Sequence, residues 1–148
     1  MDTTTKRAYA KLNLTLGVLY KRADGYHALD SIMQTIDLFD TVTVERARDI
    51  VVTSTGMLLP YDNTVRRAAE QYRALTGRSA HIRVIKRIPA EAGLGGGSAD
   101  AAATLNALQE LFGEVDEKTL VEIGAKVGAD VPFCLRGGTQ RAEGIGEV

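Results

Sequence analysis

The sequence has little cysteine and little net charge. Cys134 is the only cysteine, so no intrachain disulfide can form. This favours a reducing compartment and predicts that Cys134 is a small buried apolar residue. The formal net charge of −1 gives no overall attraction for nucleic acid or an anionic membrane. We therefore expect neither as a partner, and any anion site must be local.

Long hydrophobic runs are also missing. No uncharged apolar stretch approaches the roughly 20 residues that span a bilayer. Residues 1–11 carry basic side chains, but no apolar core or cleavage site of a signal peptide follows them. The 148 residues, with 45% hydrophobic and 25% charged side chains, have the composition of one globular domain. We expect this domain to be cytoplasmic.

Glycine, in contrast, is concentrated at one place. Four of the five positions from Gly93 to Gly97 are glycine, between a strand-like and a helix-like run. Each ordered glycine costs about 0.5 to 1 kcal/mol relative to alanine, so this cluster indicates that a bare backbone is needed. The amides of such a turn, with the first-turn N–H groups of a helix beginning near Ser98, form a cradle that suits a polyphosphate.

Two common phosphate motifs do not match this stretch. A Walker A loop needs lysine after its last glycine, and the dinucleotide fingerprint needs a third glycine where Ser98 stands. The alternative to phosphate binding is a flexible loop before a helix, with Ser98 as N-cap and Asp100 favoured by the helix dipole. A carboxylate at Asp100 would also repel a phosphate unless it points away or meets a cation.

Periodicity predicts alternating strands and helices. Strands are expected at residues 8–18, 27–37, 40–47, 49–55 and 80–88. Three helices are expected, from a cap at Asp62 or Asn63 to Gly77, from Ser98 to Gly113, and from Asp116 to Gly128. In the first strand, alternation puts Lys11, Asn13 and Thr15 on the face opposite the core. Lys86 falls on the core side of its strand, where it either reaches over the phosphates or extends past the sheet end.

The segments outside these elements are expected to form turns. Asp24-Gly25 predicts a hairpin turn between the first two strands. Gly128 to Phe133 is expected to connect into a strand, because Pro132 favours an extended Val131, and Gly137-Gly138 suits a hairpin turn. On this basis alone Asp130 is a turn residue after a helix. Residues 142–148 are typical of a loop cut in its middle, so we expect a truncated chain.

Five separate segments together carry a resemblance. They are residues 10–14, 24–27, 89–103, 128–133 and 142–147. In order, and over essentially the whole chain, they resemble the amino-terminal half of the GHMP kinases, named after the galactokinase, homoserine kinase, mevalonate kinase and phosphomevalonate kinase. Tyr26-His27 and the segment ending in Asp130 are most similar to the member that acts on a cytidine-diphosphate-linked methylerythritol in non-mevalonate isoprenoid synthesis.

The resemblance implies a fold and a domain organisation. The fold is α+β, a two-layer α/β domain with a mixed sheet, of the type first named after the second domain of a small-subunit ribosomal protein. Residues 1–148 would be the ATP-binding, catalytic amino-terminal domain, and the family's carboxy-terminal domain would be absent. Because the family's active site lies between the two halves, we expect little or no kinase activity from this chain alone. Apolar surface left uncovered would promote self-association.

The resemblance also implies residue roles in phosphoryl transfer from ATP to the substrate's 2-hydroxyl. Asp130 would take the hydroxyl proton, and Lys11 beside it would help to hold the incipient alkoxide. Asn13 would contact the substrate, Tyr26 would stack on the cytosine, and His27 would hydrogen-bond to it. The ATP contacts implied are Asn63, Lys86, Pro89, Gly93, Leu94, Gly95, Gly96, Gly97 and Ser98. Mg²⁺ is expected with ATP, although no dedicated ligand set is visible.

One departure and two alternatives bear on this hypothesis. Many family members have two serines after the glycines, whereas this chain has Ser98-Ala99, so any help from a second hydroxyl is missing. The alternatives are a GHMP kinase of the homoserine or mevalonate type, or a non-catalytic nucleotide-binding module. Tyr26-His27 argues against the first, since only a base-bearing substrate needs that pair. The near-zero net charge disfavours a nucleic-acid-binding version of the second.

Overall fold

A mixed β-sheet forms one layer of the molecule. The computed structural model describes residues 2–21, 27–90, 93–137 and 139–144, and for 14–31 and 139–144 it describes the backbone alone. The strands are β1 (Thr3–Lys21), β2 (His27–Ala47), β3 (Val51–Thr55), β4 (Ser79–Ile85) and β5 (Thr139–Gly144). Their order is β1-β2-β4-β3, and β5 also pairs with β2. The β3–β4 pair is parallel and the other pairs are antiparallel, which confirms the mixed sheet.

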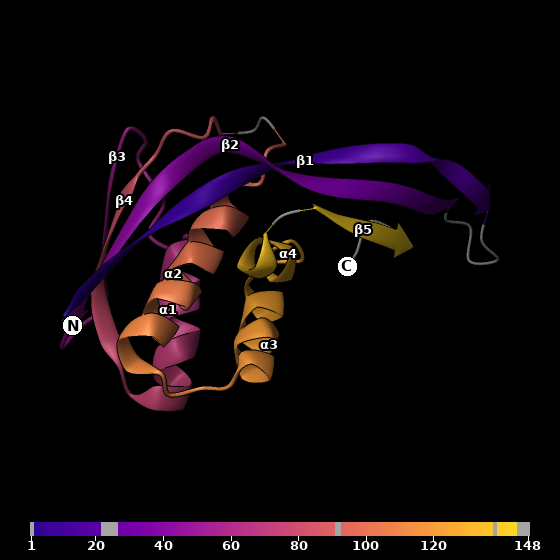
Figure 1. Ribbon diagram of the computed structural model, residues 1–148. Helices are drawn as coiled ribbons and strands as arrows, with labels where there is room; N and C mark the ends of the chain where they lie inside the picture. The colour runs from indigo at the N-terminus through magenta and orange to yellow at the C-terminus, as the bar shows by residue number, and fades with distance from the viewer. Residues whose placement is uncertain (1, 22–26, 91–92, 138, 145–148) are drawn as a thin grey trace.

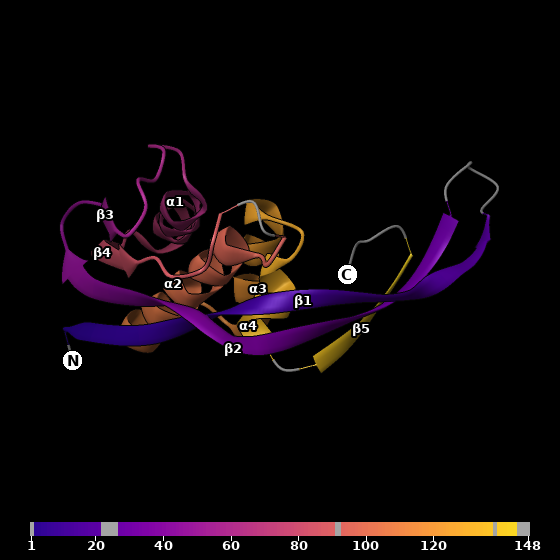
Figure 2. The ribbon, with the colours of Figure 1, turned by 90° about the horizontal axis from the view of Figure 1, so that it is seen from above.

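Helices form the second layer, on one face of the sheet (Figure 1). They are α1 (Thr64–Thr76), α2 (Gly96–Phe112), α3 (Glu117–Val127) and α4 (Val131–Arg136). Figure 2 shows β1 and β2 extending beyond this layer as a long ribbon, with β5 beside it. Two layers with a mixed sheet confirm the predicted α+β fold.

α2 is the central helix of the core. Alanines fill its first turns, and Ala99, Ala101 and Ala102 are at most 2% exposed. Such small side chains let the helix backbone approach the sheet closely. Further along, Leu105 and Leu108 pack into the same core, which also holds apolar residues of α1, β2 and β4. The packing fixes the first turn of α2, where the glycine stretch ends, against β1.

The predicted alternation of β1 fails at Lys11. Tyr9 pairs with Phe39 but Lys11 pairs with Thr35, so the register shifts between them. Ala10 and Lys11 are consequently both buried. The prediction that Lys11 faces away from the core is therefore wrong, because the irregularity turns its side chain inward. Register irregularities of this kind commonly re-aim side chains near active sites.

The segment after α3 also differs from the prediction. Residues 131–136 form the helix α4, not a strand, and Gly137 (φ +70°) ends it. Pro132 lies in the first turn, where a missing N–H group costs nothing because it would have no intrahelical acceptor. Gly137 therefore ends a helix and not a strand, and Gly138, the other residue of the predicted hairpin turn, lies outside the described residues.

The other elements follow the prediction with two changes. The strands expected at 27–37 and 40–47 are one strand, β2, and the strand expected to reach residue 88 ends at Ile85. The antiparallel β1–β2 pairing agrees with the predicted hairpin, whose turn residues Asp24 and Gly25 lie outside the described residues. In the described parts of the chain, no helix is long and apolar enough to cross a membrane. The cytoplasmic location stays a prediction.

Candidate active site

The glycine stretch forms a turn that leads directly into α2. Gly93 and Gly95 have φ of +70° and +71°, a region that favours glycine. Gly95 is the N-cap and offers no side-chain cap. Ser98, the N-cap in the flexible-loop alternative, lies instead in the first helical turn. The first helical hydrogen bond runs from the Ala99 N–H to the Gly95 carbonyl, at 2.9 Å. The amides before Ala99 have no intrahelical acceptor and can serve an anion.

A cavity of about 250 Å³ lies beside this turn. Of the residues predicted to contact ATP, it is lined by Lys86, Pro89, Gly93, Leu94, Gly95, Gly96 and Gly97. The turn thus has room for a ligand. Met57 and Leu59, which were not predicted from the sequence, line the same cavity from the loop after β3. An apolar run inside a loop was the signal that could have identified them.

Lys11 joins the glycine turn to Asp130. Its Nζ lies 3.2 Å from the Asp130 Oδ2, and its backbone N–H donates to the Leu94 carbonyl at 2.9 Å. Its stem packs against Gly95, where an added Cβ would come within 2.9 Å of the Lys11 Cε. The Lys11 side chain is 8% exposed and that of Asp130 is 30% exposed. An accessible carboxylate beside a buried ammonium is suited to take a proton from a hydroxyl while the cation stabilises the resulting oxyanion.

Two further contacts hold the turn in place. The Thr64 hydroxyl, at the start of α1, donates to the Gly97 carbonyl at 2.7 Å. The Ser98 hydroxyl lies near Gly128, 3.8 Å from where a Cβ on that glycine would stand. The start of α1 therefore contacts the start of α2, and the start of α2 lies near the connector that carries Asp130.

Beneath the turn lies a buried cluster of Asp40, Lys86 and Asp100. The Lys86 Nζ donates to the Oδ2 of Asp40 and of Asp100, each at 2.7 Å. Asp100 is 2% exposed and meets a cation, one of the two arrangements that the sequence analysis allows beside a phosphate. It shares that cation with Asp40. The predicted nucleotide contact of Lys86 stays a prediction, because its ammonium is held by two carboxylates although its side chain lines the cavity.

The two carboxyls of this cluster have pKa values shifted in opposite directions. Burial, followed by the hydrogen bond with Asp40, raises the pKa of Asp100 to about 8. Burial also pushes the pKa of Asp40 upward, but hydrogen bonds with Asp100, Ile88, Lys86 and Arg87 outweigh it and the pKa of Asp40 is lowered. Burial opposes the charge of Lys86, yet its two carboxylate partners raise the pKa of the ammonium.

The remaining predicted residues lie elsewhere or are not described. Asn63 is the N-cap of α1: its Oδ1 accepts from the Arg66 N–H at 2.8 Å and its Nδ2 donates to the Pro60 carbonyl at 2.9 Å. Asn13 is exposed on β1. Tyr26 lies outside the described residues, and only the backbone of His27 is described. Their predicted ligand contacts stay predictions.

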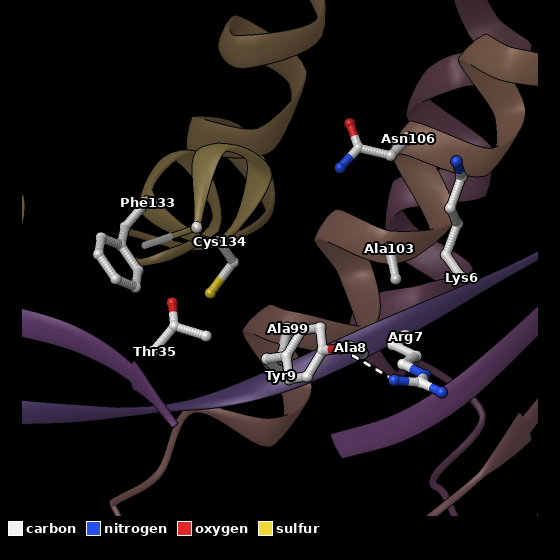
Figure 3. Close-up of a pocket in the computed structure, with 11 residues that line it drawn as sticks. Lys6, Arg7, Ala8, Tyr9, Thr35, Ala99, Ala103, Asn106, Phe133 and Cys134 are labelled. Carbon is white, nitrogen blue, oxygen red and sulfur yellow. Dashed lines mark hydrogen bonds between the residues drawn. The ribbon is translucent and has the colours of Figure 1, made fainter. Parts of the chain in front are cut away.

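A second cavity, of about 90 Å³, lies between β1, α2 and α4, and its lining residues are drawn in Figure 3. It is lined by Cys134 together with Tyr9, Ala99 and Asn106, and it holds none of the predicted site residues. Burial, followed by the charge of Asp130, raises the pKa of the Cys134 thiol to about 12. A thiol that stays protonated at neutral pH is a poor nucleophile. Cys134 packs against the core as predicted, but it is partly buried and not fully buried.

The residues that the structure describes offer no metal centre of their own. Among them, no group of three or more His, Cys, Asp or Glu side chains could hold a metal ion. Because a Mg²⁺ bound to nucleotide phosphates needs only one or two carboxylates from the protein, the expected Mg²⁺ stays a prediction.

Relatives of known identity match the chain closely. It is 47% identical over 150 residues to the 4-diphosphocytidyl-2-C-methyl-D-erythritol kinase of Caldicellulosiruptor saccharolyticus, covering 95% of this chain and 51% of that enzyme. It is 50% identical over 145 residues to the same kinase of Carboxydothermus hydrogenoformans, covering 95% of this chain and 50% of that enzyme. The chain thus spans about half the length of the curated relatives it matches.

Solved structures agree with this fold. A crystal structure of 4-(cytidine 5'-diphospho)-2C-methyl-D-erythritol kinase matches with a TM-score of 0.82 and 42% identity, over 97% of this chain and 53% of that one. The homoserine kinase of Cytophaga hutchinsonii shares the fold, with a TM-score of 0.69 and 22% identity over 94% of this chain and 48% of that one. The family model "GHMP kinases N terminal domain" matches residues 63–138, about half of the chain. The chain therefore belongs to the GHMP kinases, of which it carries the N-terminal domain.

Proposed function

We propose that this chain supplies the ATP-binding and catalytic part of a kinase that phosphorylates the 2-hydroxyl of 4-diphosphocytidyl-2-C-methyl-D-erythritol. The names of relatives 47% and 50% identical support the substrate. The single observation that carries the chemistry is the Lys11–Asp130 pair, at 3.2 Å, next to a glycine turn with free amides. Residues 1–148 would be one domain of the complete enzyme.

Each group has a defined task in this proposal. The amides of the turn and the first turn of α2 bind the ATP phosphates, and any Mg²⁺ arrives with those phosphates. Asp130 accepts the proton of the substrate hydroxyl, and Lys11 neutralises charge on the attacking oxygen. Because phosphoryl transfer has a loose transition state, positioning and electrostatics supply most of the catalysis. Asn13, Tyr26 and His27 contact the cytidine-bearing substrate.

Nucleotide binding is the first test. Calorimetric titration of the 148-residue chain with ATP should show binding, and Asp130→Asn should bind with nearly the same affinity, because Asp130 is not among the nucleotide contacts. The absence of a binding signal from both the unmodified chain and Asp130→Asn would contradict the proposed phosphate site.

Turnover is the second test. It uses a chimera in which this chain replaces the matching half of the Carboxydothermus hydrogenoformans relative, 50% identical over 145 residues. We expect the chimera to phosphorylate the cytidylyl substrate and Asp130→Asn to lower kcat on the order of 10²- to 10⁴-fold. The matched control is Asp116→Asn, an exposed N-cap carboxylate of α3 whose amide replacement keeps the cap. Equal kcat for Asp130→Asn and the control would refute the assignment of the base.

The same assay separates the alternatives. Transfer to homoserine or mevalonate at a comparable rate would favour another GHMP kinase, whereas nucleotide binding with no transfer by the chimera would favour a binding module. We further propose that the 148-residue chain alone turns over little substrate and self-associates at high concentration. Measurable turnover by the chain, or a monomer by light scattering at high concentration, would contradict these two statements.

A further inference from the structure

We propose that Asp40, Lys86 and Asp100 form a positioning cluster for the glycine turn, that this cluster retains one proton, and that nucleotide affinity falls when the proton leaves. The inference rests on the proposed function, because it assumes that the turn binds a nucleotide's phosphates. It adds residues that do not touch the nucleotide but control the turn that does.

The cluster holds both ends of the turn. Before the turn, the Asp40 Oδ1 accepts from the backbone N–H groups of Arg87 (2.5 Å) and Ile88 (2.8 Å). After it, Lys86 lies directly under the start of α2, since a Cβ on Gly96 would stand 3.3 Å from the Lys86 Nζ. Asp100, in the same helix, binds that ammonium. The spacing between the two ends of the turn therefore depends on one set of hydrogen bonds.

The charges of the cluster do not balance when both carboxylates are ionised. Two carboxylates and one ammonium leave a net charge of −1 beneath a site for an anion. One proton makes the cluster neutral. Burial of an ion without full compensation is costly, so the protonated cluster is the favoured form.

The hydrogen bonds indicate where the proton resides. Asp40 accepts from three N–H groups, one on Lys86 and two on the backbone. Asp100 accepts an N–H hydrogen bond from Lys86 alone, and its Oδ1 is buried without a partner among the residues that the structure describes. Its hydrogen bond with Asp40 joins two carboxyls, so that bond exists only when one of them carries a proton. The proton therefore belongs mainly to Asp100. Because the two carboxyls interact, they titrate as a pair. The raised pKa of Asp100 and the lowered pKa of Asp40 agree with this placement.

Other charged groups near Asp100 do not remove the imbalance. Asp40 faces it from β2 and Lys86 from the end of β4. Cys134 of α4, which is electrostatically coupled to Asp100, has a thiol that stays neutral below about pH 12. Lys11 of β1 and Asp130 of the α3–α4 connector neutralise each other. Loss of the proton thus adds one uncompensated negative charge under the phosphates.

Titration with ATP between pH 7.5 and 9.5 tests the inference, because the nucleotide's phosphates are already ionised over that range. For the unmodified chain the dissociation constant for ATP should rise on the order of tenfold between the two ends of this range. This is the effect of one unit charge repelling another over about 10 Å at an effective dielectric constant near 20. For Asp100→Asn, which cannot lose the proton, the dissociation constant should stay level across the range. The surface variant Asp116→Asn should follow the unmodified chain.

The outcomes separate the two proposals. No ATP binding at any pH contradicts the proposed function. Binding with the same pH dependence in the unmodified chain and in Asp100→Asn overturns the cluster inference and leaves the proposed function standing. A ¹³C NMR titration of the aspartate carboxyl carbons gives a readout without nucleotide: a step near pH 8 should be present in the unmodified chain and missing in Asp100→Asn. A spectrum without that step also overturns the inference.

Discussion

At the scale of single residues, the site depends on a close contact between Gly95 and Lys11. Gly95 has φ of +71°, and a Cβ there would lie 2.9 Å from the Cε and 3.0 Å from the Cγ of Lys11. Contacts this short force the lysine stem to move. The ammonium would then lose its place 3.2 Å from the Asp130 carboxylate, so a substitution in the phosphate turn would act on the proposed proton-transfer pair.

Gly95→Ala should therefore lower both turnover and nucleotide affinity by more than its backbone strain explains. The matched control is Gly77→Ala, because Gly77 has φ of +75° and a Cβ there would meet nothing within 4 Å. Each variant should lose about 1 kcal/mol or slightly more of folding free energy from the left-handed conformation, measured by urea unfolding. Only Gly95→Ala should lose kcat in the chimera. Equal kcat for the two variants would show that the Lys11 contact is unimportant.

At the scale of elements, variants of Asn63 test whether this residue acts only as the N-cap of α1 or also contacts the nucleotide. Asn63→Ala removes the acceptor for the Arg66 N–H and the donor to the Pro60 carbonyl, and should lower the free energy of unfolding by roughly 1 kcal/mol. Asn63→Asp keeps the cap acceptor and should recover most of that loss. Identical stability of the alanine variant and the unmodified chain would contradict the cap assignment. A weaker ATP affinity of the folded variants would support the nucleotide contact predicted from the sequence.

The elements also show what the sequence could predict. α1 and α3 were predictable because an apolar stripe at helical spacing was bounded by a cap and a glycine. α4 was missed since its six residues are too few for a periodicity and Pro132 favoured an extended chain. Likewise, the side-chain direction of Lys11 was mispredicted because alternation assumes a regular register, and an irregularity leaves no local mark in the sequence. The resemblance, not the periodicity, brought Lys11 and Asp130 forward as a pair.

At the scale of the whole molecule, two layers bring distant segments to one place. Lys11 comes from β1, Asp100 from α2 and Asp130 from the connector before α4. These segments come together because α2 lies against β1 and α4, an arrangement that no local sequence pattern specifies. The sequence did predict that Asp100 would have to point away from a phosphate or meet a cation, yet the partners Asp40 and Lys86 lie 60 and 14 residues away along the chain. A buried charge cluster of this kind links the candidate site to the stability of the entire domain.

That link predicts how stability depends on pH. The pKa of Asp100 is raised in the folded chain from 3.8 to about 8. A raised pKa means that the folded chain holds the extra proton, so the stabilisation from this group is fully present below about pH 4 and is lost as the pH rises to about 8. The free energy of unfolding should therefore fall with a slope of up to about 1.4 kcal/mol per pH unit in that window. The lowered pKa of Asp40 affects the free energy of unfolding only at acid pH, because the stabilisation from this group is lost as the pH falls through its pKa in the folded chain.

Asp100→Asn should remove this slope, because an amide does not titrate. Urea unfolding of the unmodified chain and the variant at pH 5, 6.5 and 8 would measure it, and the stability of the variant relative to the unmodified chain should increase with each step. Asp116→Asn is again the control: the pKa of Asp116 is lowered by its hydrogen bonds to Thr119, so its contribution is constant over this range. Parallel pH profiles for Asp100→Asn and the unmodified chain would show that Asp100 ionises normally and that the buried cluster carries its full negative charge.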